Sequence, residues 1–284
     1  MIGRLTRISL PAALLYALGA CAGGVGGAVA QAPTAAESPD ADRAIRPSGL
    51  RPVFAKNADC PPIASEFGAQ TRYDGSRRPR FRFGGYHGGM DLSLPEGTAL
   101  LALAAGTVVT KGEGGQAEGI YVWLRHAPQD TGLADWVYAK YQHLATLPDL
   151  ALGARVAVGQ VLGRSGKTGT VGGHYGPSGY PHLHLTTLRS AAGEYRVEGT
   201  RVSAPGGYLF DPVAVYHEAQ APGAARPSRG DTAVAIPYVT TDGQASPAGT
   251  RVVWPVACRP RGEARLIGDR LRRSRRPTAP RRSP

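Results

Sequence analysis

Histidine is the residue type whose spacing in this chain most clearly points to chemistry. The chain has seven histidines, and His182 and His184 are separated by one residue within the run from Pro181 to Leu188. Side chains two residues apart in a β-strand point to the same face of the sheet. Both imidazoles are therefore predicted to lie on one face, where a neutral ring nitrogen can bind a metal ion or accept a proton.

A second group of candidate ligands lies earlier in the chain, where His87 is followed by two glycines, Met90 and Asp91. The glycine pair disfavours a helix, and positions four apart in an extended segment share a face. Zinc prefers histidine nitrogen and carboxylate oxygen, and a catalytic zinc has three protein ligands and leaves the fourth position to water. Two strands would thus present four candidate side chains, and the spacing alone does not decide between His182 and His184.

The elements that carry these residues are predicted to be β-strands. Glycine and proline are frequent, and helix-period apolar stripes are hard to find outside the N-terminus. Apolar residues recur in short runs broken by glycine: Leu100 to Val109, Ile120 to Leu124, Trp136 to Leu144, Val156 to Leu162 and His182 to Leu188. We expect an all-β (mainly β) fold with an antiparallel sandwich or barrel-like sheet, a core between about Leu50 and Tyr216, and disordered termini.

The N-terminus has the layout of a secretory signal peptide. Arg4 and Arg7 precede an apolar stretch from Ile8 to Leu18, and small residues follow. The stretch is shorter than the roughly 20 residues of a membrane span. Two cleavage sites compete: a lipoprotein-type site before Cys21 and an ordinary site after Ala30. The sequence predicts export to the periplasm or cell envelope, with lipid anchoring through Cys21 as one of the two alternatives.

We expect five segments along the chain. They are a signal peptide (residues 1–30), a linker rich in alanine, proline and acidic residues (31–49), the main domain (50–217), a C-terminal extension (218–258) and a basic tail (259–284). Within the extension, Ala233 to Val239 and Arg251 to Val256 are expected to form one hairpin.

The net charge of +12 is concentrated in the tail. From Arg259 to Pro284 there are ten arginines against Glu263 and Asp269, a balance of +8 that leaves +4 for the rest of the chain. Such a segment is most simply solvated and disordered, and its functional interpretation is adhesion to a polyanion. The export signal favours an anionic envelope surface as the partner and argues against nucleic acid.

Three cysteines suit an exported chain. Cys21 is either lipidated or removed with the signal, which leaves Cys60 and Cys258 as the candidates for a disulfide. The alternative is a pair of buried free thiols.

Three segments of the chain resemble the signatures of lysostaphin-like (LytM-type) zinc endopeptidases. They are Tyr86 to Asp91, Tyr141 to Leu144 and His182 to His184. Intervening residues match the family's connecting pattern in order, notably Ala104 to Val108 and Gly159 to Gly169, and the resemblance covers roughly Phe67 to Tyr216. The family implies a β-rich fold of the duplicated hybrid-motif type and an activity against peptide bridges or stems of peptidoglycan.

The resemblance also implies a role for each matching residue. His87, Asp91 and His184 match the ligands of one zinc ion, and His143 and His182 match two catalytic histidines that do not bind the metal. Zinc polarises a peptide carbonyl and lowers the pKa of its bound water, while an imidazole can accept and return the proton. The expected function is zinc-dependent hydrolysis of peptide bonds in peptidoglycan cross-links or stem peptides. The alternative is a non-catalytic wall-binding regulator or amidase activator.

Two features depart from the family pattern. The loop from Gly169 to Pro181 is longer than the usual link, which leaves the shape of the substrate groove open. Leu185 and Thr186 stand where the family often has phenylalanine and glutamate, so the residues behind the ligands are expected to differ. Three histidines are assigned no role. His126 and His217 are expected on the surface, and His174 is expected to be solvated or to line the groove.

Overall fold

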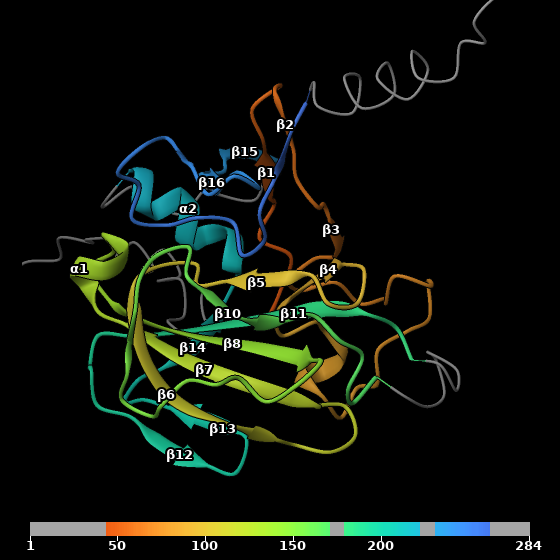
Figure 1. The fold of residues 1–284 in the computed structure, drawn as a ribbon. Coiled ribbons are helices and arrows are strands. Elements are labelled where there is room, and N and C mark those ends of the chain that lie inside the picture. The colour runs from red at the N-terminus through yellow and green to blue at the C-terminus, as the bar shows by residue number, and fades with distance from the viewer. Residues whose placement is uncertain (1–43, 171–178, 222–230, 262–284) are drawn as a thin grey trace, which may run out of the picture. The chain divides into compact units, whose positions relative to one another are not determined.

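The computed structural model describes residues 44–170, 179–221 and 231–261 (Figure 1). The predicted signal peptide, the two cleavage sites, His174, and most of the predicted linker and tail lie outside the described residues. Within the described ranges, no helix combines the length and the apolar character needed to cross a membrane.

Strands and turns make up most of the described chain, so the mainly-β prediction is confirmed (Figure 1). Two α-helices, α1 (Pro128–Thr131) and α2 (Pro212–Gln220), and a 3-10 turn, η1 (Phe83–Gly85), interrupt the strands. The strands in chain order are β1 (Leu50–Val53), β2 (Ala58–Asp59), β3 (Ile63–Ser65), β4 (Met90–Ser93), β5 (Ala99–Leu101), β6 (Gly106–Glu113), β7 (Ile120–His126), β8 (Trp136–Leu144), β9 (Arg155–Val156), β10 (Val161–Arg164), β11 (His182–Ser190), β12 (Arg196–Glu198), β13 (Arg201–Ser203), β14 (Tyr208–Phe210), β15 (Thr232–Ala235), β16 (Tyr238–Val239), β17 (Ala245–Ser246) and β18 (Arg259–Pro260).

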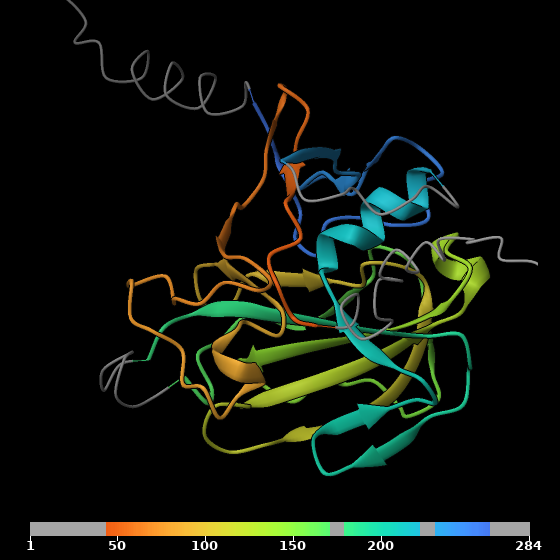
Figure 2. The ribbon, with the colours of Figure 1, turned by 180° about the vertical axis from the view of Figure 1, so that it is seen from behind.

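The central sheet has eight strands in the order β3-β4-β11-β8-β7-β6-β9, with β14 paired to the C-terminal part of β11. Its pairings are antiparallel, as predicted. Figure 2 shows the long strands of this sheet running across the molecule. The pairing of β4 with β11 brings together the two segments that carry the candidate ligands.

Side-chain alternation gives the central sheet two different faces. Tyr141 and Leu185 are fully buried in the main apolar core. Their neighbours Gln142 and His184 are register partners and line a cleft on the opposite face. A smaller apolar cluster that includes Tyr138 also lies outside the main core. One face of the sheet therefore packs on the main core, and the opposite face borders the cleft.

Two of the predicted strand runs are each divided between two strands. The run from Leu100 to Val109 contributes to β5 and β6, and the run from Val156 to Leu162 contributes to β9 and β10. β5 pairs with β10 in a separate two-stranded sheet, whereas β6 and β9 pair in the central sheet. Gly159 lies between β9 and β10 with a φ of 73°, a conformation that glycine adopts without steric cost.

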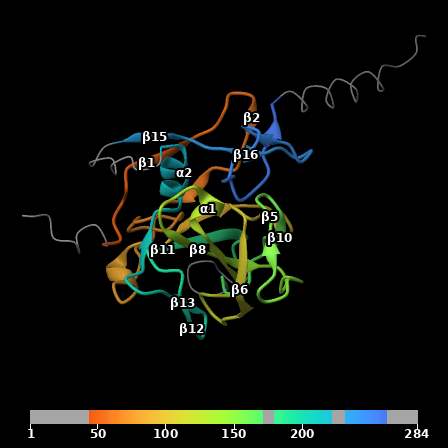
Figure 3. The same ribbon diagram turned by 90° about the vertical axis from the view of Figure 1, so that its left-hand side faces the viewer.

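The core extends further along the chain than predicted. Val234, Ile236, Trp254 and Val256 are buried in the same core cluster as the central sheet, so the predicted limit at Tyr216 is wrong. The physical reason is a parallel pairing of β15 with β1 that returns the C-terminal segment to the start of the domain (Figure 3). A parallel pairing between segments so far apart in sequence has no local signal.

The predicted hairpin of the C-terminal extension is also wrong in its partners. β16 pairs with β17, and the segment from Arg251 to Val256 meets the one from Ala233 to Val239 through a backbone hydrogen bond from Trp254 to the Pro237 carbonyl rather than through a hairpin ladder. That segment instead lies against the core through Trp254, whose ring contacts Phe54 edge-on at 5.2 Å.

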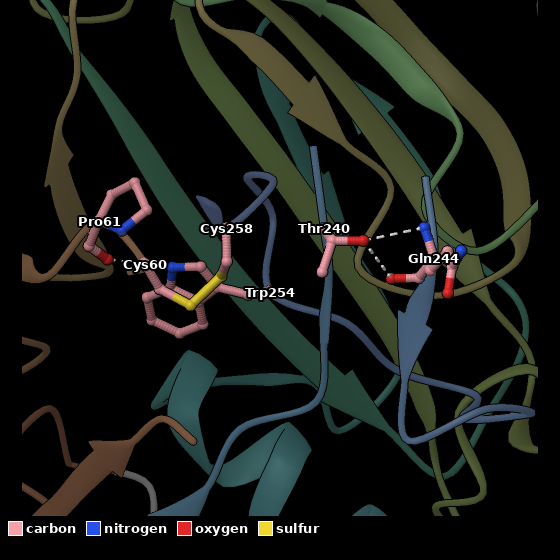
Figure 4. The surroundings of a disulfide bond; sticks show 6 residues. All are labelled: Cys60, Pro61, Thr240, Gln244, Trp254 and Cys258. Carbon is pink, nitrogen blue, oxygen red and sulfur yellow. Dashed lines mark hydrogen bonds between the residues drawn. A yellow bond between two sulfur atoms is a disulfide. The ribbon is translucent and has the colours of Figure 1, made fainter. Parts of the chain in front are cut away.

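The structure contains the disulfide between Cys60 and Cys258, one of the two alternatives for these cysteines (Figure 4). Beside it, the Trp254 indole donates a hydrogen bond of 3.1 Å to the Pro61 carbonyl oxygen. β18 directly follows Cys258 and pairs with β2. Arg259 and Pro260 therefore belong to a paired strand, and the predicted boundary of the basic tail at residue 259 is wrong.

Candidate metal centre

His87, Asp91 and His184 come together at one point on the cleft side of the sheet. Their candidate ligand atoms lie within 4.8 Å of one another. Asp91 Oδ1 is 3.3 Å from His87 Nε2 and 2.8 Å from His184 Nδ1, and these two nitrogens are 3.1 Å apart. Three donor atoms thus converge from two chain segments.

The backbone around the first segment explains this convergence. Asp91 and His184 are register partners on β4 and β11, so strand pairing alone places them side by side. His87 precedes β4, and its backbone N–H donates to the Ala69 carbonyl. A Cβ atom at Gly89 would lie 2.4 Å from the Leu185 carbonyl oxygen, so glycine is required where this segment passes β11.

Each of the two candidate ligand histidines has a hydrogen-bond partner on the ring nitrogen that does not face Asp91. His87 Nδ1 lies 2.9 Å from the Glu66 carbonyl oxygen and must donate to it. His184 Nε2 lies 3.0 Å from Thr186 Oγ1. Each contact fixes the ring while its other nitrogen faces the common point, as is usual for metal-binding histidines. Thr186, one of the two departures from the family pattern, supplies this contact for His184.

Asp91 is held in its ionised form. Burial acts to raise its pKa, but His87 and His184 together hold the pKa well below its ordinary value. Arg78 adds a cation 3.5 Å from Asp91 Oδ2, the oxygen that faces away from the histidine pair. Two imidazoles and one carboxylate, all buried or nearly so, form a donor set that suits tetrahedral zinc.

His143 reaches the site through an irregularity in β8. Leu144 pairs with Ile120, and Gln142 pairs with Tyr121, so His143 is an extra residue on β8. Its φ of 64° is the left-handed conformation, which is uncommon for residues other than glycine. This bulge places the His143 ring 4.4 Å from the ring of His182 and 6.1 Å from that of His184, measured between centroids.

The two non-ligand candidates, His143 and His182, have the same hydrogen-bond arrangement. His143 Nδ1 lies 2.7 Å from the Thr168 carbonyl oxygen, and His182 Nδ1 lies 2.8 Å from that of Tyr180. A carbonyl only accepts, so both Nδ1 atoms carry the hydrogen and both Nε2 atoms keep a lone pair. Burial lowers the pKa of both imidazoles, and neighbouring histidines hold that of His143 well below its ordinary value. Both rings are neutral proton acceptors at pH 7.

Comparison with known protein families decides what this arrangement belongs to. Residues 85–196 match the model of peptidase family M23. This segment is an M23 peptidase domain. It contains all five candidate residues, so the site lies within a domain of a hydrolase family.

The M23 domain of this chain is also similar to several solved structures. The catalytic domain of lysostaphin from Staphylococcus simulans is 25% identical, covers 45% of this chain and 83% of its own, and gives a TM-score of 0.32. A zinc-containing peptidase from Vibrio cholerae is 23% identical, with 52% and 37% covered and a TM-score of 0.34. The catalytic domain of the prophage-encoded protein EnpA from Enterococcus faecalis is 19% identical, with 61% and 98% covered and a TM-score of 0.36. None of the curated proteins matches this chain.

A cleft of about 610 Å³ opens beside the candidate metal centre of the M23 domain. Its lining includes a partly buried charge cluster that the sequence analysis missed. Glu118 accepts hydrogen bonds from Lys140, from Gln142 Nε2 at 2.8 Å and from Arg82 at 2.8 Å. A lysine inside the otherwise uncharged run from Trp136 to Leu144 is the signal that could have revealed it.

His126 and His217 lie apart from the site. His126 is fully buried, so the surface prediction for it is wrong. Its Nδ1 lies 2.7 Å from the Ala105 carbonyl oxygen, and the absence of a side chain at Gly106 leaves room for the ring. His217 is half-buried on α2 and does not line the cleft.

Proposed function

We propose that this chain is a zinc-dependent endopeptidase that hydrolyses peptide bonds in bacterial peptidoglycan. The observation that carries the proposal is the pairing of two sets of histidines in an M23 domain. His87 and His184 turn one nitrogen each toward Asp91, whereas His143 and His182 each donate from Nδ1 to a backbone carbonyl and keep Nε2 as a proton acceptor. The first set suits a metal ion and the second set suits proton transfer.

His87, Asp91 and His184 would hold the zinc. A bound zinc ion would polarise the scissile carbonyl and supply a water of lowered pKa. His143 and His182, jointly, accept a proton from the attacking water and return it to the leaving amine. A ring that has taken up the proton donates to the developing oxyanion. The backbone carbonyls of Thr168 and Tyr180 keep both rings oriented through these steps.

The proposal includes a place of action in the bacterial envelope. The signal-peptide layout at the N-terminus supports export, and a disulfide such as that between Cys60 and Cys258 persists in oxidising compartments. The arginines that follow Arg261 would add attraction to an anionic envelope surface. Deleting residues 262–284 is expected to weaken retention on isolated envelopes at low salt and to leave hydrolysis unchanged.

Digestion of purified peptidoglycan sacculi tests the activity. The mature chain is incubated with sacculi after zinc is restored, and the released fragments are identified by mass spectrometry. New amino and carboxyl termini in the peptide stems or cross-links are expected, and their position gives the bond cleaved. A folded, zinc-loaded protein that leaves sacculi intact would overturn the proposal in favour of a wall-binding regulator.

A further inference from the structure

The cleft of the M23 domain carries more positive charge than the candidate metal centre requires. Among the residues that the structure describes, five cationic side chains and two carboxylates line it. The cations are Arg72, Arg78, Arg82, Lys140 and Arg201, and the carboxylates are Asp91 and Glu118.

Ion pairing leaves part of this charge without a carboxylate partner. Arg78 faces Asp91, while Arg82 and Lys140 share Glu118. Burial acts to raise the pKa of Glu118, but its two cationic partners lower it overall, so one negative charge faces two positive ones.

Arg72 and Arg201 add two further positive charges. The guanidinium of Arg72 is hydrogen-bonded to Ser76 and to the Arg77 carbonyl, both uncharged acceptors. Arg201 is exposed, and its side chain makes no salt bridge or hydrogen bond among the described residues. With the metal ion aside, the cleft lining has an excess of three positive charges. A cleft lined by one sign of charge attracts ligands of the opposite sign.

Strand register gives the position of this excess relative to the metal centre. His184 pairs with Gln142, and Thr186 pairs with Lys140 two residues further along the same strands. Two residues of a strand span about 7 Å. Lys140 in turn pairs with Trp123 on β7, whose indole donates to the Thr200 carbonyl next to Arg201. Lys140 therefore lies one strand across and two residues along from His184, and Arg201 follows the residue that Trp123 of the next strand contacts.

We infer that Arg201, with Arg82 and Lys140 behind it, forms a subsite for a free carboxylate of the substrate peptide, about two residues from the scissile bond. The inference rests on the proposed function and narrows it to peptides that carry such a carboxylate. Of these three cations, Arg201 is the one available to bind a ligand. Lys140 is buried, and Arg82 and Lys140 are both paired with Glu118.

The test compares untreated sacculi with sacculi whose carboxylates have been amidated with carbodiimide and ammonium. Amidation leaves phosphate groups unchanged, so a loss of rate assigns the contact to carboxylates. The wild type is expected to digest amidated sacculi at least tenfold more slowly. Arg201→Gln is expected to digest untreated sacculi about tenfold more slowly than the wild type and to be nearly indifferent to amidation.

Arg196→Gln is the matched control, because Arg196 is an exposed arginine of the same β12–β13 hairpin that does not line the cleft. It is expected to behave as the wild type. Binding gives a second readout: Arg201→Gln in an inactive His143→Asn background should sediment less with untreated sacculi than His143→Asn alone. Equal wild-type rates on both sacculi, or equal behaviour of the two arginine variants, would overturn the inference. Digestion of neither substrate by any variant would instead refute the proposed function.

Discussion

His143 directly follows Gln142 on β8, and both side chains line the same cleft. Neighbouring residues of a regular strand point to opposite faces. The exception exists because His143 is the extra residue of a bulge and has a φ of 64°. Gln142 contacts the charge cluster through Glu118, and His143 contacts the ring of His182. The bulge at His143 therefore places the candidate proton-transfer histidines beside Gln142, which contacts the charge cluster of the candidate carboxylate subsite.

Replacing His143 with asparagine is expected to remove activity without disturbing the backbone. Asparagine tolerates the left-handed conformation, whereas alanine at this position would add strain. Loss of a general acid or base lowers the rate by about 10² to 10⁴-fold. Digestion of sacculi by His143→Asn should fall by this factor, while zinc content and thermal midpoint match the wild type. His217→Asn, outside the cleft, is the control. A fully active His143→Asn would exclude His143 from proton transfer.

Metal removal is expected to lower the stability of the wild type but not that of a ligand variant. A ligand that binds only the native state stabilises it by about 4 kcal/mol at 1,000 times its Kd. Adding EDTA should therefore lower the thermal midpoint of the zinc-loaded wild type. Asp91→Asn should contain little zinc and show no response to EDTA. Asp149→Asn changes an exposed carboxylate outside the cleft and should respond as the wild type does. Stoichiometric zinc in Asp91→Asn would contradict the ligand assignment.

His126 is expected to make the M23 domain less stable in acid. Burial lowers the pKa of His126 to about 4 from its ordinary value of 6.5. The neutral ring is therefore favoured in the folded state, and its contribution is present above pH 6.5 and is lost as the pH falls toward 4. The shift in pKa corresponds to a contribution of about 3 kcal/mol to the free energy of unfolding at neutral pH.

Urea unfolding of wild type and His126→Asn at pH 7 and pH 4.5 measures this contribution. The variant lacks the titrating ring but can still donate to the Ala105 carbonyl. Its loss of unfolding free energy between the two pH values should be smaller than that of the wild type. The other buried histidines titrate in both proteins and cancel in the comparison. Equal losses in the two proteins would show that His126 is not the source.

The strands of the central sheet were predictable because their signals are local. Short apolar runs broken by glycine, such as Trp136 to Leu144, indicate strands, and the spacing of His182 and His184 follows from the period of a β-strand. Placing His87 and Asp91 beside His184 required the pairing of β4 with β11, which the sequence could supply only through the family resemblance. The roles of the five site residues remain predictions.

The features that were not predictable depend on long-range contacts. His126 ends an apolar strand two residues before a proline, which resembles an exposed strand end, yet the packing of Gly106 on β6 encloses its ring. The segment from Arg251 to Val256 carries no signal of burial beyond its composition. It joins the core because β15 pairs with β1 and Cys258 pairs with Cys60, both across most of the domain.

This disulfide leads to a prediction about stability that is separate from activity. Cys60 and Cys258 close a loop with a sequence separation of 198 residues, and the chain-entropy model assigns up to about 5 kcal/mol to such a bond. The double variant Cys60→Ala, Cys258→Ala should lose unfolding free energy on this scale in urea. Reducing agent should destabilise the wild type similarly and leave the double variant unaffected.

The same double variant should remain active wherever it is still folded. Neither cysteine lines the cleft. Four of the five site residues lie on strands of the central sheet and His87 shortly precedes β4, so none depends on the pairing of β2 with β18. Its rate on sacculi at low temperature is therefore expected to match that of the wild type, with a lower thermal midpoint. An equal midpoint for the two proteins would show that β1–β15 pairing and the burial of Trp254 hold the C-terminal segment without the covalent link.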